Sequence, residues 1–352
     1  MKLAIISLKG ESSSKIADEA SNFFSEVERL DLRKIEVHST SKGLEVLYDG
    51  NPIKKYDCIY VRGSHKYSLL QRTLTEALGK EAYMPLRPSS FTIGHDKFLT
   101  LVELEKNKVP IPATYLAATV NSAKKILSKI DFPIIMKLST GTQGKGVMFA
   151  DSVQSANSIL DTLEVFKQPY IIEEYIETNT TDIRVIVAGD EVVGAMKRKA
   201  TPDEMRANIH MGGKGTNYIP APDIEQIALK ASKAIGADIC AVDILEGLKP
   251  MVIEVNLSPG LGGITKATGK NIAKSIAKVL YDKTKLFKSS KTSQDYNNVL
   301  KDINKNEEIV TNLEVKAGKI RLPEIITRAS GLRSDEEVSI SVSKGKLIIK
   351  KM

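Results

Sequence analysis

Two neighbouring strand-like segments carry side chains that could hold a metal ion. Asp243 lies in the apolar segment 239–244, and Glu254 and Asn256 lie in the β-branched segment 252–256. A short loop separates the segments, so pairing them would bring all three side chains to one face. Such oxygen ligands suit Mg²⁺, which one or two carboxylates usually hold together with substrate phosphates. Outward-facing acids on a half-exposed hairpin are also common, so this pattern alone leaves both interpretations open.

A glycine-rich loop with lysines nearby could handle phosphate. The strand-like segment 133–138 carries Lys137, the loop STGTQGKG follows at 139–146, and a second strand-like segment spans 147–150. A P-loop or dinucleotide fingerprint needs a helix after its glycines, so neither fits here. Glycines let backbone N–H groups approach phosphate closely, and Lys137 and Lys145 supply positive charge. A flexible turn has the same composition, but the nearby acids favour phosphate binding.

Arginines flank these segments. Arg184 lies in the alternating segment 182–187, Arg198 ends the next strand-like segment, and Arg206 and Asn208 lie in the loop beyond it. The planar guanidinium group fits carboxylate and phosphate oxygens. Solvated basic residues are the alternative interpretation, although several arginines converging on one acid cluster are less usual.

The elements before residue 88 alternate between strand and helix patterns. Strand-like segments at 2–8 and 57–62 and a helical pattern near 68–79 predict a small, mostly parallel α/β sheet. Ligands of such sheets lie beyond the carboxyl ends of the strands. Arg62 and His65 are therefore candidate substrate contacts, with solvated loop residues as the alternative.

The composition is that of a folded protein with more than one domain. The chain has 352 residues, of which 42% are hydrophobic and 27% charged, which predicts two or three domains. Cys58 and Cys240 lie in apolar segments, as buried structural thiols do, and a disulfide framework is excluded. The absence of a long apolar run argues against a membrane protein, and the strand-like N-terminus is unlike a signal peptide, so a cytoplasmic location is expected. The net charge of +8 favours anionic partners.

Together these segments resemble the ATP-grasp superfamily and, within it, the RimK-like α-L-glutamate ligases. The motifs that carry the resemblance are, in chain order, HDKFLT, IIMKLSTGTQGKGV, IIEEYI, DIRVIVAGDEVVGAMKR, MRANIHMGG, AVDIL and IEVNLSPGLGGITKATG. The close resemblance covers residues 84–286. The order of the motifs identifies the superfamily, but it is less specific for the substrate. One departure is Met211, where the family usually has an arginine, and it bears on substrate contacts rather than on ATP.

The resemblance implies how a nucleotide would be bound. Lys97 and Lys137 would contact the phosphates, with the glycine-rich loop closing over them. Glu174 and Tyr175 would face adenine, and Asp182 would face the ribose. The implied nucleotide-binding residues are Lys97, Lys137, Gly141, Gln143, Gly144, Lys145, Gly146, Glu174, Tyr175, Asp182, Arg206 and Asn208.

The resemblance also implies metal and catalytic residues. Asp243, Glu254 and Asn256 would hold two Mg²⁺ ions, for which Mn²⁺ could substitute. The catalytic residues would be Arg184, Arg198 and Arg206. The first two would orient the acyl-phosphate or the incoming amino acid, and Arg206 would lie near the γ-phosphate and the reacting carboxylate.

The implied fold class is α/β (α+β ATP-grasp). A Rossmann-like pre-ATP-grasp domain would span residues 1–88, and a two-lobed ATP-grasp domain would span 89–287, with lobes at about 113–178 and 179–287. A polar linker would follow at 288–312. Residues 313–352 resemble an AbrB/MazE-type swapped-hairpin domain. This β-rich unit is too small to bury its own faces, which predicts a homo-oligomer, either a dimer through the tail or a tetramer.

The implied reaction is an ATP-dependent ligation. A carboxylate would attack the γ-phosphate of ATP to give an acyl-phosphate and ADP, and an amine would then displace phosphate to form an amide. The partners would be ATP, L-glutamate or another amino acid, and an unknown carboxylate acceptor: a protein C-terminus, a peptide or a small molecule.

Two alternatives stay open. One is ligation on an amino-group carrier protein of lysine or arginine biosynthesis. The other is a DNA-binding regulator in which the ATP-grasp part senses nucleotide. A nucleotide sensor is disfavoured because Lys137, Asp243, Glu254 and Asn256 are all intact, and a domain that only senses a ligand need not keep every metal ligand. DNA binding by the tail is disfavoured because the tail is attached to an apparent enzyme.

Overall fold

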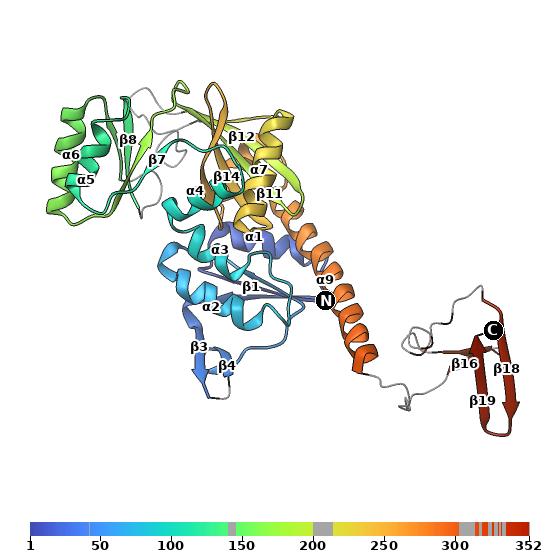
Figure 1. The fold of residues 1–352 in the computed structure, drawn as a ribbon. Helices are drawn as coiled ribbons and strands as arrows, with labels where there is room; N and C mark the ends of the chain where they lie inside the picture. The colour runs from blue at the N-terminus through green and yellow to red at the C-terminus, as the bar shows by residue number, and fades with distance from the viewer. Residues whose placement is uncertain are drawn as a thin grey trace. The chain divides into compact units, whose positions relative to one another are not determined.

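The computed structural model describes residues 1–41, 43–139, 146–199, 214–302, 314–316, 319–322 and 336–351 and the single positions 326, 330 and 332 (Figure 1). The chain forms two compact units, Met1–Lys285 and Leu286–Met352. Mixed α/β architecture in the first unit agrees with the fold class expected from the sequence. None of the helices in the described part of the chain is long and apolar enough to cross a membrane.

The first sheet is parallel and has the strand order β2-β1-β6. Its central strand is buried almost throughout because its apolar residues are covered on both faces, as expected for a parallel sheet between helices. The elements around it are β1 (Lys2–Ser7), α1 (Glu11–Ala20), β2 (Glu26–Asp31), β3 (Ile35–Thr40), β4 (Gly43–Tyr48), β5 (Asn51–Pro52), β6 (Cys58–Val61) and α2 (Ser68–Leu78). The α/β sheet predicted for this region is therefore confirmed.

The second sheet is antiparallel, with the order β7-β10-β8-β9. Two helices pack with it around a separate apolar core that includes Leu127, Met136 and Leu160. Its elements are β7 (Thr114–Tyr115), α5 (Val120–Leu127), β8 (Ile134–Leu138), β9 (Val147–Ala150), α6 (Val153–Val165) and β10 (Tyr170–Glu174). The glycine-rich segment thus connects two antiparallel strands, as predicted.

The third sheet has the order β13-β12-β11-β14-β15, and its neighbouring strands pair in antiparallel fashion. Helix α7 packs on several of its strands, which explains why the inner strand β14 is buried from Ile239 to Ile244. The elements of this region are α3 (Pro88–Ile93), α4 (Lys97–Lys106), β11 (Thr181–Ala188), β12 (Glu191–Lys199), β13 (Lys214–Asn217), α7 (Pro222–Ile235), β14 (Ile239–Glu246), β15 (Pro250–Asn256) and α8 (Gly262–Thr268).

Helix α9 (Ile272–Asp302) contains the boundary between the two units. Residues 288–302, which the sequence favours as a polar linker, belong to this helix. The segment 271–302 contains neither glycine nor proline, so nothing in its backbone chemistry stops the helix.

The second unit contains two short antiparallel pairs. Strand β16 (Glu314–Lys316) pairs with β17 (Lys319–Arg321), and β18 (Val338–Ser343) pairs with β19 (Lys346–Lys351). The hairpin predicted at Lys344-Gly345 is confirmed, with Gly345 at φ +75°, a left-handed conformation that glycine adopts without strain.

Candidate active site

The hairpin β14–β15 brings the predicted metal ligands together. Asp243 lies directly opposite Glu254, and Ala241 lies opposite Asn256. Opposed residues of an antiparallel pair point to the same face, as do residues two apart on one strand. The register shifts next to Asp243, and such a bulge redirects side chains locally. The side chains of Asp243, Glu254 and Asn256 therefore share one face.

Two arginines from neighbouring strands bind the aspartates. Arg184 donates to both carboxylate oxygens of Asp243 at 2.8 and 2.6 Å. Arg198 donates to both oxygens of Asp182 at 2.6 Å each and lies 3.0 Å from Asp243. The strand register sets these pairs, because Arg184 is opposite Asp243 and Asp182 is opposite Arg198. The result is a balanced quartet of two cations and two anions.

Asn256 joins this network through its amide. With its nitrogen donating to Glu254 Oε1 at 3.1 Å, its oxygen accepts from Arg184 Nη2 at 3.2 Å. This orientation satisfies both ends of the amide. The same oxygen atom is the one that could serve as a metal ligand.

The ionisation of the three acids follows from burial and these partners. Burial raises the pKa of Asp243, but Arg184 and Arg198 together outweigh it and hold the pKa below the ordinary value. Burial raises the pKa of Asp182 above its ordinary value, against the attraction of Arg198. The pKa of Glu254 is raised by burial and by the nearby charge of Asp243. A bound cation would therefore favour the charged form of Glu254, which its surroundings disfavour.

The oxygen ligands that the chain provides at this site are suitable for Mg²⁺. The described residues contain no cluster of three His, Cys, Asp or Glu side chains that could hold a metal on its own. Two carboxylates and one amide offer oxygen ligands, and a magnesium ion completes its shell with water and substrate phosphates. Because Arg184 already binds both oxygens of Asp243, a cation would have to share or replace those contacts.

Two of the predicted phosphate-binding lysines, Lys97 and Lys137, lie on different elements. Lys97 is the first residue of α4, which Asp96 caps through a bond from Leu99 N of 2.8 Å. Burial lowers the pKa of Lys97, and Glu254 opposes that shift. Lys137 Nζ donates to Glu173 Oε1 at 2.5 Å. Glu173 is buried, and its Oε2 has no hydrogen-bond partner among the described residues.

The two predicted adenine contacts are consecutive residues. Glu174 is the last residue of strand β10, and Tyr175 is the first residue after it. The N–H of Glu174 donates to Ala113 O at 2.8 Å, and its carboxylate accepts from Ala113 N at 3.1 Å. The Tyr175 hydroxyl donates to Glu177 at 3.2 Å, and its ring meets Phe149 edge-on, with centroids 5.4 Å apart. Glu174 is therefore partly engaged by its own neighbours.

Several predicted residues lie outside the described part of the chain: Gly141, Gln143, Gly144, Lys145, Arg206 and Asn208. Gly146 is described, at φ +78°, and its carbonyl accepts from Leu138 N at 2.9 Å. It closes the strand pair β8–β9. The nucleotide and catalytic roles of all these residues stay predictions.

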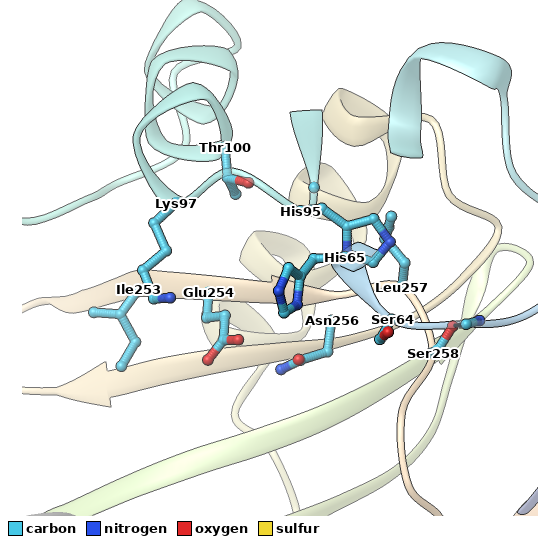
Figure 2. Close-up of a pocket in the computed structure, with 12 residues that line it drawn as sticks. Ser64, His65, His95, Lys97, Thr100, Ile253, Glu254, Asn256, Leu257 and Ser258 are labelled. Carbon is cyan, nitrogen blue, oxygen red and sulfur yellow. Dashed lines mark hydrogen bonds between the residues drawn. The ribbon is translucent and has the colours of Figure 1, made fainter. Parts of the chain in front are cut away.

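A cavity of about 230 Å³ adjoins the acid cluster (Figure 2). Its lining comes from the segment after β6, the turn between α3 and α4, the first turn of α4, and strand β15 with the loop after it. These residues are Gly63, Ser64, His65, Gly94, His95, Lys97, Thr100, Ile253, Glu254, Asn256, Leu257 and Ser258. The sequence singled out His65 but not His95, although His95 stands directly before the Asp96-Lys97 motif.

Arg62 does not line this cavity. It is buried and donates to Pro259 O at 2.7 Å and to Tyr60 Oη at 3.0 Å. The interpretation of Arg62 as a substrate contact is therefore wrong, because its guanidinium group ties the loop after β6 to the turn after β15. The neighbouring Gly63 N–H strengthens this link by donating to Ser258 Oγ at 3.0 Å.

Comparison with known proteins agrees with this architecture. The family model of the RimK-like ATP-grasp domain matches residues 94–280. A probable alpha-L-glutamate ligase of Marinomonas sp. (strain MWYL1) is 32% identical over 298 residues, which covers 83% of this chain and 99% of the relative. A second, from Legionella pneumophila (strain Corby), is 39% identical over 198 residues, or 55% of this chain and 66% of the relative.

Solved structures share the fold. A RimK domain ATP-grasp protein from Sphaerobacter thermophilus DSM 20745 superposes with a TM-score of 0.62 at 16% identity, over 79% of this chain and 99% of that one. A RiPP-associated ATP-grasp ligase from Chryseobacterium gregarium, in complex with ADP and with a leader and core peptide, gives a TM-score of 0.61 at 20% identity, over 80% of this chain and 97% of that one. From the domain match, the full-length relatives and the shared fold, this chain belongs to the RimK-like ATP-grasp family and is an ATP-grasp ligase.

Proposed function

We propose that this ligase joins L-glutamate to a carboxylate acceptor with ATP and Mg²⁺, through an acyl-phosphate and with release of ADP. The observation that carries the proposal is the register of β14–β15, which sets Asp243, Glu254 and Asn256 on one face. Relatives described as probable alpha-L-glutamate ligases support the choice of glutamate. Neighbours of the same fold in complex with Mg and ADP support the cofactors.

Each group at the site has a place in such a reaction. Lys97 and Lys137 supply positive charge where the phosphates would lie, and Arg184 and Arg198 hold the acid cluster in one geometry. Phosphoryl transfer asks a protein mainly for positioning and for neutralisation of charge on the transferred group. We assign Lys97 and Lys137 to the phosphates of ATP, Asp182 to its ribose, and Glu174 and Tyr175 to adenine. Arg184 and Arg198 remain the residues that would orient the acyl-phosphate or the incoming amino acid.

The metal would be held by Asp243, Glu254 and Asn256. Bound there, Mg²⁺ neutralises phosphate charge during the transfer, and a second ion would share the same ligands. The raised pKa of Glu254 fits this role, since a cation restores the charged form that burial opposes. We keep Arg206 and Asn208 as proposed contacts of the γ-phosphate and the reacting carboxylate.

ADP release tests the proposal directly. The full-length protein is incubated with ATP, Mg²⁺ and each of several amino acids, and the products are examined by mass spectrometry for added glutamyl units. L-glutamate carries both a carboxylate and an amine, so it can serve as the acceptor and as the incoming amino acid. We therefore expect ADP to form with L-glutamate, and we expect products heavier than glutamate by one or more glutamyl units. If no amino acid supports ADP formation while the protein retards DNA in a salt-dependent way, the ligase proposal fails and a regulatory role replaces it.

The second unit would assemble copies of the chain. Strand β18 and its partner expose Ile340, Val342 and Leu347, which are 58%, 77% and 43% exposed. Large apolar side chains on a two-stranded ribbon have little to pack against, because a lone hairpin is marginally stable. A second copy would cover them. Sedimentation of the full chain tests this, since a purely monomeric protein at micromolar concentration contradicts it.

A further inference from the structure

The cavity beside the acid cluster is lined by residues outside the sheet β7-β10-β8-β9, which carries the proposed adenine contact Glu174. Its described lining includes Glu254 and Asn256 at one end but no residue of the sheet β7-β10-β8-β9. A group in the cavity could therefore reach the phosphate end of ATP without occupying the adenine side. That is the approach that a substrate of the proposed ligation needs.

The walls of the cavity are held in place by contacts between distant segments. Gly63 and Ser258 are joined by a hydrogen bond of 3.0 Å. Thr100 Oγ1 donates to Ile93 O at 2.8 Å and fixes the turn that carries His95. A Cβ added at Gly94 would lie 3.0 Å from Leu257, so glycine lets this turn approach the loop after β15. These contacts fix the positions of the loop after β6, the turn between α3 and α4, and the loop after β15, which together form the cavity walls.

Beyond the acid end, the polar side chains of the lining are the ammonium of Lys97, the imidazoles of His65 and His95, and the hydroxyls of Ser64, Thr100 and Ser258. His65 and His95 line the same cavity as Glu254 and Asn256 (Figure 2). Neutral imidazole and hydroxyl groups both donate hydrogen bonds. Apart from Glu254, the described lining has no acidic side chain, so these donors suit an anionic oxygen group.

The size of the cavity limits what can enter. A volume of about 230 Å³ equals roughly eight water molecules at about 30 Å³ each. One amino-acid unit fits this space, and a larger acceptor could place only its terminal residue there. A carboxylate on that unit is the chemical group that His65 and His95 could bind through their N–H groups.

We propose that this cavity binds one amino-acid unit through a carboxylate, and that His65 and His95 determine which substrate is accepted. The unit is either the incoming amino acid or the terminal residue of the acceptor, since both carry the same carboxylate. This inference rests on the proposed ligase function. In this proposal, His65 and His95 recognise the substrate, and the residues of the acid cluster act in the chemical step.

Histidine NMR tests the binding without turnover. The full-length protein with Mg²⁺ and ADP is titrated separately with L-glutamate and with the dipeptide L-glutamyl-L-glutamate, and signals are assigned with single His→Gln variants. We expect the side-chain signals of His65 and His95 to move, and that of His38, an exposed residue of β3, to stay. A response to glutamate identifies the incoming amino acid, and a response to the dipeptide alone identifies the acceptor's terminal residue. If neither probe moves either signal, the inference is overturned.

Steady-state kinetics of histidine variants provide a second test of the inference. Loss of a hydrogen bond to a charged group costs about tenfold or more in binding, so His65→Ala and His95→Ala should raise KM for the responding substrate by about that factor. KM for ATP should stay within about twofold, and His38→Ala should match the wild type. Unchanged KM values in both variants would refute the inference while wild-type ADP release continues to support the ligase. Absence of ADP release with every amino acid would instead refute the proposed function.

Discussion

Replacing Arg198 by methionine would leave two buried aspartates with a single arginine. Arg198, Asp182 and Asp243 are only 5%, 8% and 2% exposed, and Arg198 donates to both oxygens of Asp182 at 2.6 Å. Removing one member of a buried ion cluster leaves an unpaired charge, which costs about 3–5 kcal/mol. At roughly 2–4 °C per kcal/mol, the melting temperature of Arg198→Met should fall by roughly 6–20 °C.

Urea unfolding at pH 8, followed by far-ultraviolet circular dichroism, measures this cost. The double variant Asp182→Asn/Arg198→Met removes the charge that the single variant exposes, so it should be more stable than Arg198→Met by about 1 kcal/mol or more. Arg29→Met is the matched control, because Arg29 pairs with Asp18 on the surface and such pairs contribute about 0–1 kcal/mol.

The pH dependence gives a second check on the same reasoning. In Arg198→Met, Asp182 loses its cation, so its folded pKa rises further above the unfolded value of about 3.9. The folded state then binds more protons than the unfolded state, and the variant loses stability as pH rises from about 4 to 8. A deficit that is below about 1 kcal/mol at pH 8, or a double variant no more stable than the single one, would refute the buried-quartet account.

Three further predictions concern the acid cluster and the cavity. Glu254→Ala should lower the rate of ADP release more than about 100-fold with the fold intact by circular dichroism, since even outer-shell partners of a metal are worth about 10–100-fold; undiminished turnover would contradict the metal assignment. Burial and a neighbouring histidine lower the pKa of His95 to about 4. As the pH falls from 6.5 to 4, this histidine therefore takes up a proton in the unfolded chain but not in the folded one, and the free energy of unfolding should decrease. The substitution His95→Gln should make this decrease smaller. Gly63→Ala should cost about 1–3 kcal/mol, because its Cβ would lie 2.7 Å from buried Gln71 and 2.8 Å from buried Leu32; an unchanged urea midpoint would contradict that packing.

Local patterns in the sequence were sufficient to predict the hairpin and its face. Strand alternation and the short loop after Glu246 gave the pairing of β14 with β15, which the structure confirms with Asp243 opposite Glu254. Alternation has a period of two, so a correct strand assignment fixes which side chains share a face. The glycine-rich connection between β8 and β9 was predictable for the same reason, since a strand pattern resumes directly after it.

Contacts between distant segments were not predictable in this way. His95 reaches the cavity because the turn between α3 and α4 packs against Leu257, and no spacing rule connects two segments so far apart. Arg62 was predicted to be either a substrate contact or a solvated loop residue, and its burial was unpredictable for the same reason. A position after the carboxyl end of a strand predicts a ligand contact, but the turn at Pro259 offers a carbonyl that captures the guanidinium group.

Asp182 and Arg198 show what motif matching can and cannot assign. A matching motif fixes the position of a residue on its strand, whereas the partner of the side chain depends on the register of the neighbouring strands. Here the register sets Asp182 opposite Arg198, and both carboxylate oxygens accept from that arginine. A ribose hydroxyl at Asp182 would therefore compete with a charged, bidentate donor, which is the stronger partner. If Asp182 does contact ribose, Asp182→Asn should raise KM for ATP. Added to Arg198→Met, the same substitution should again raise KM for ATP, although the double variant should be more stable than Arg198→Met alone.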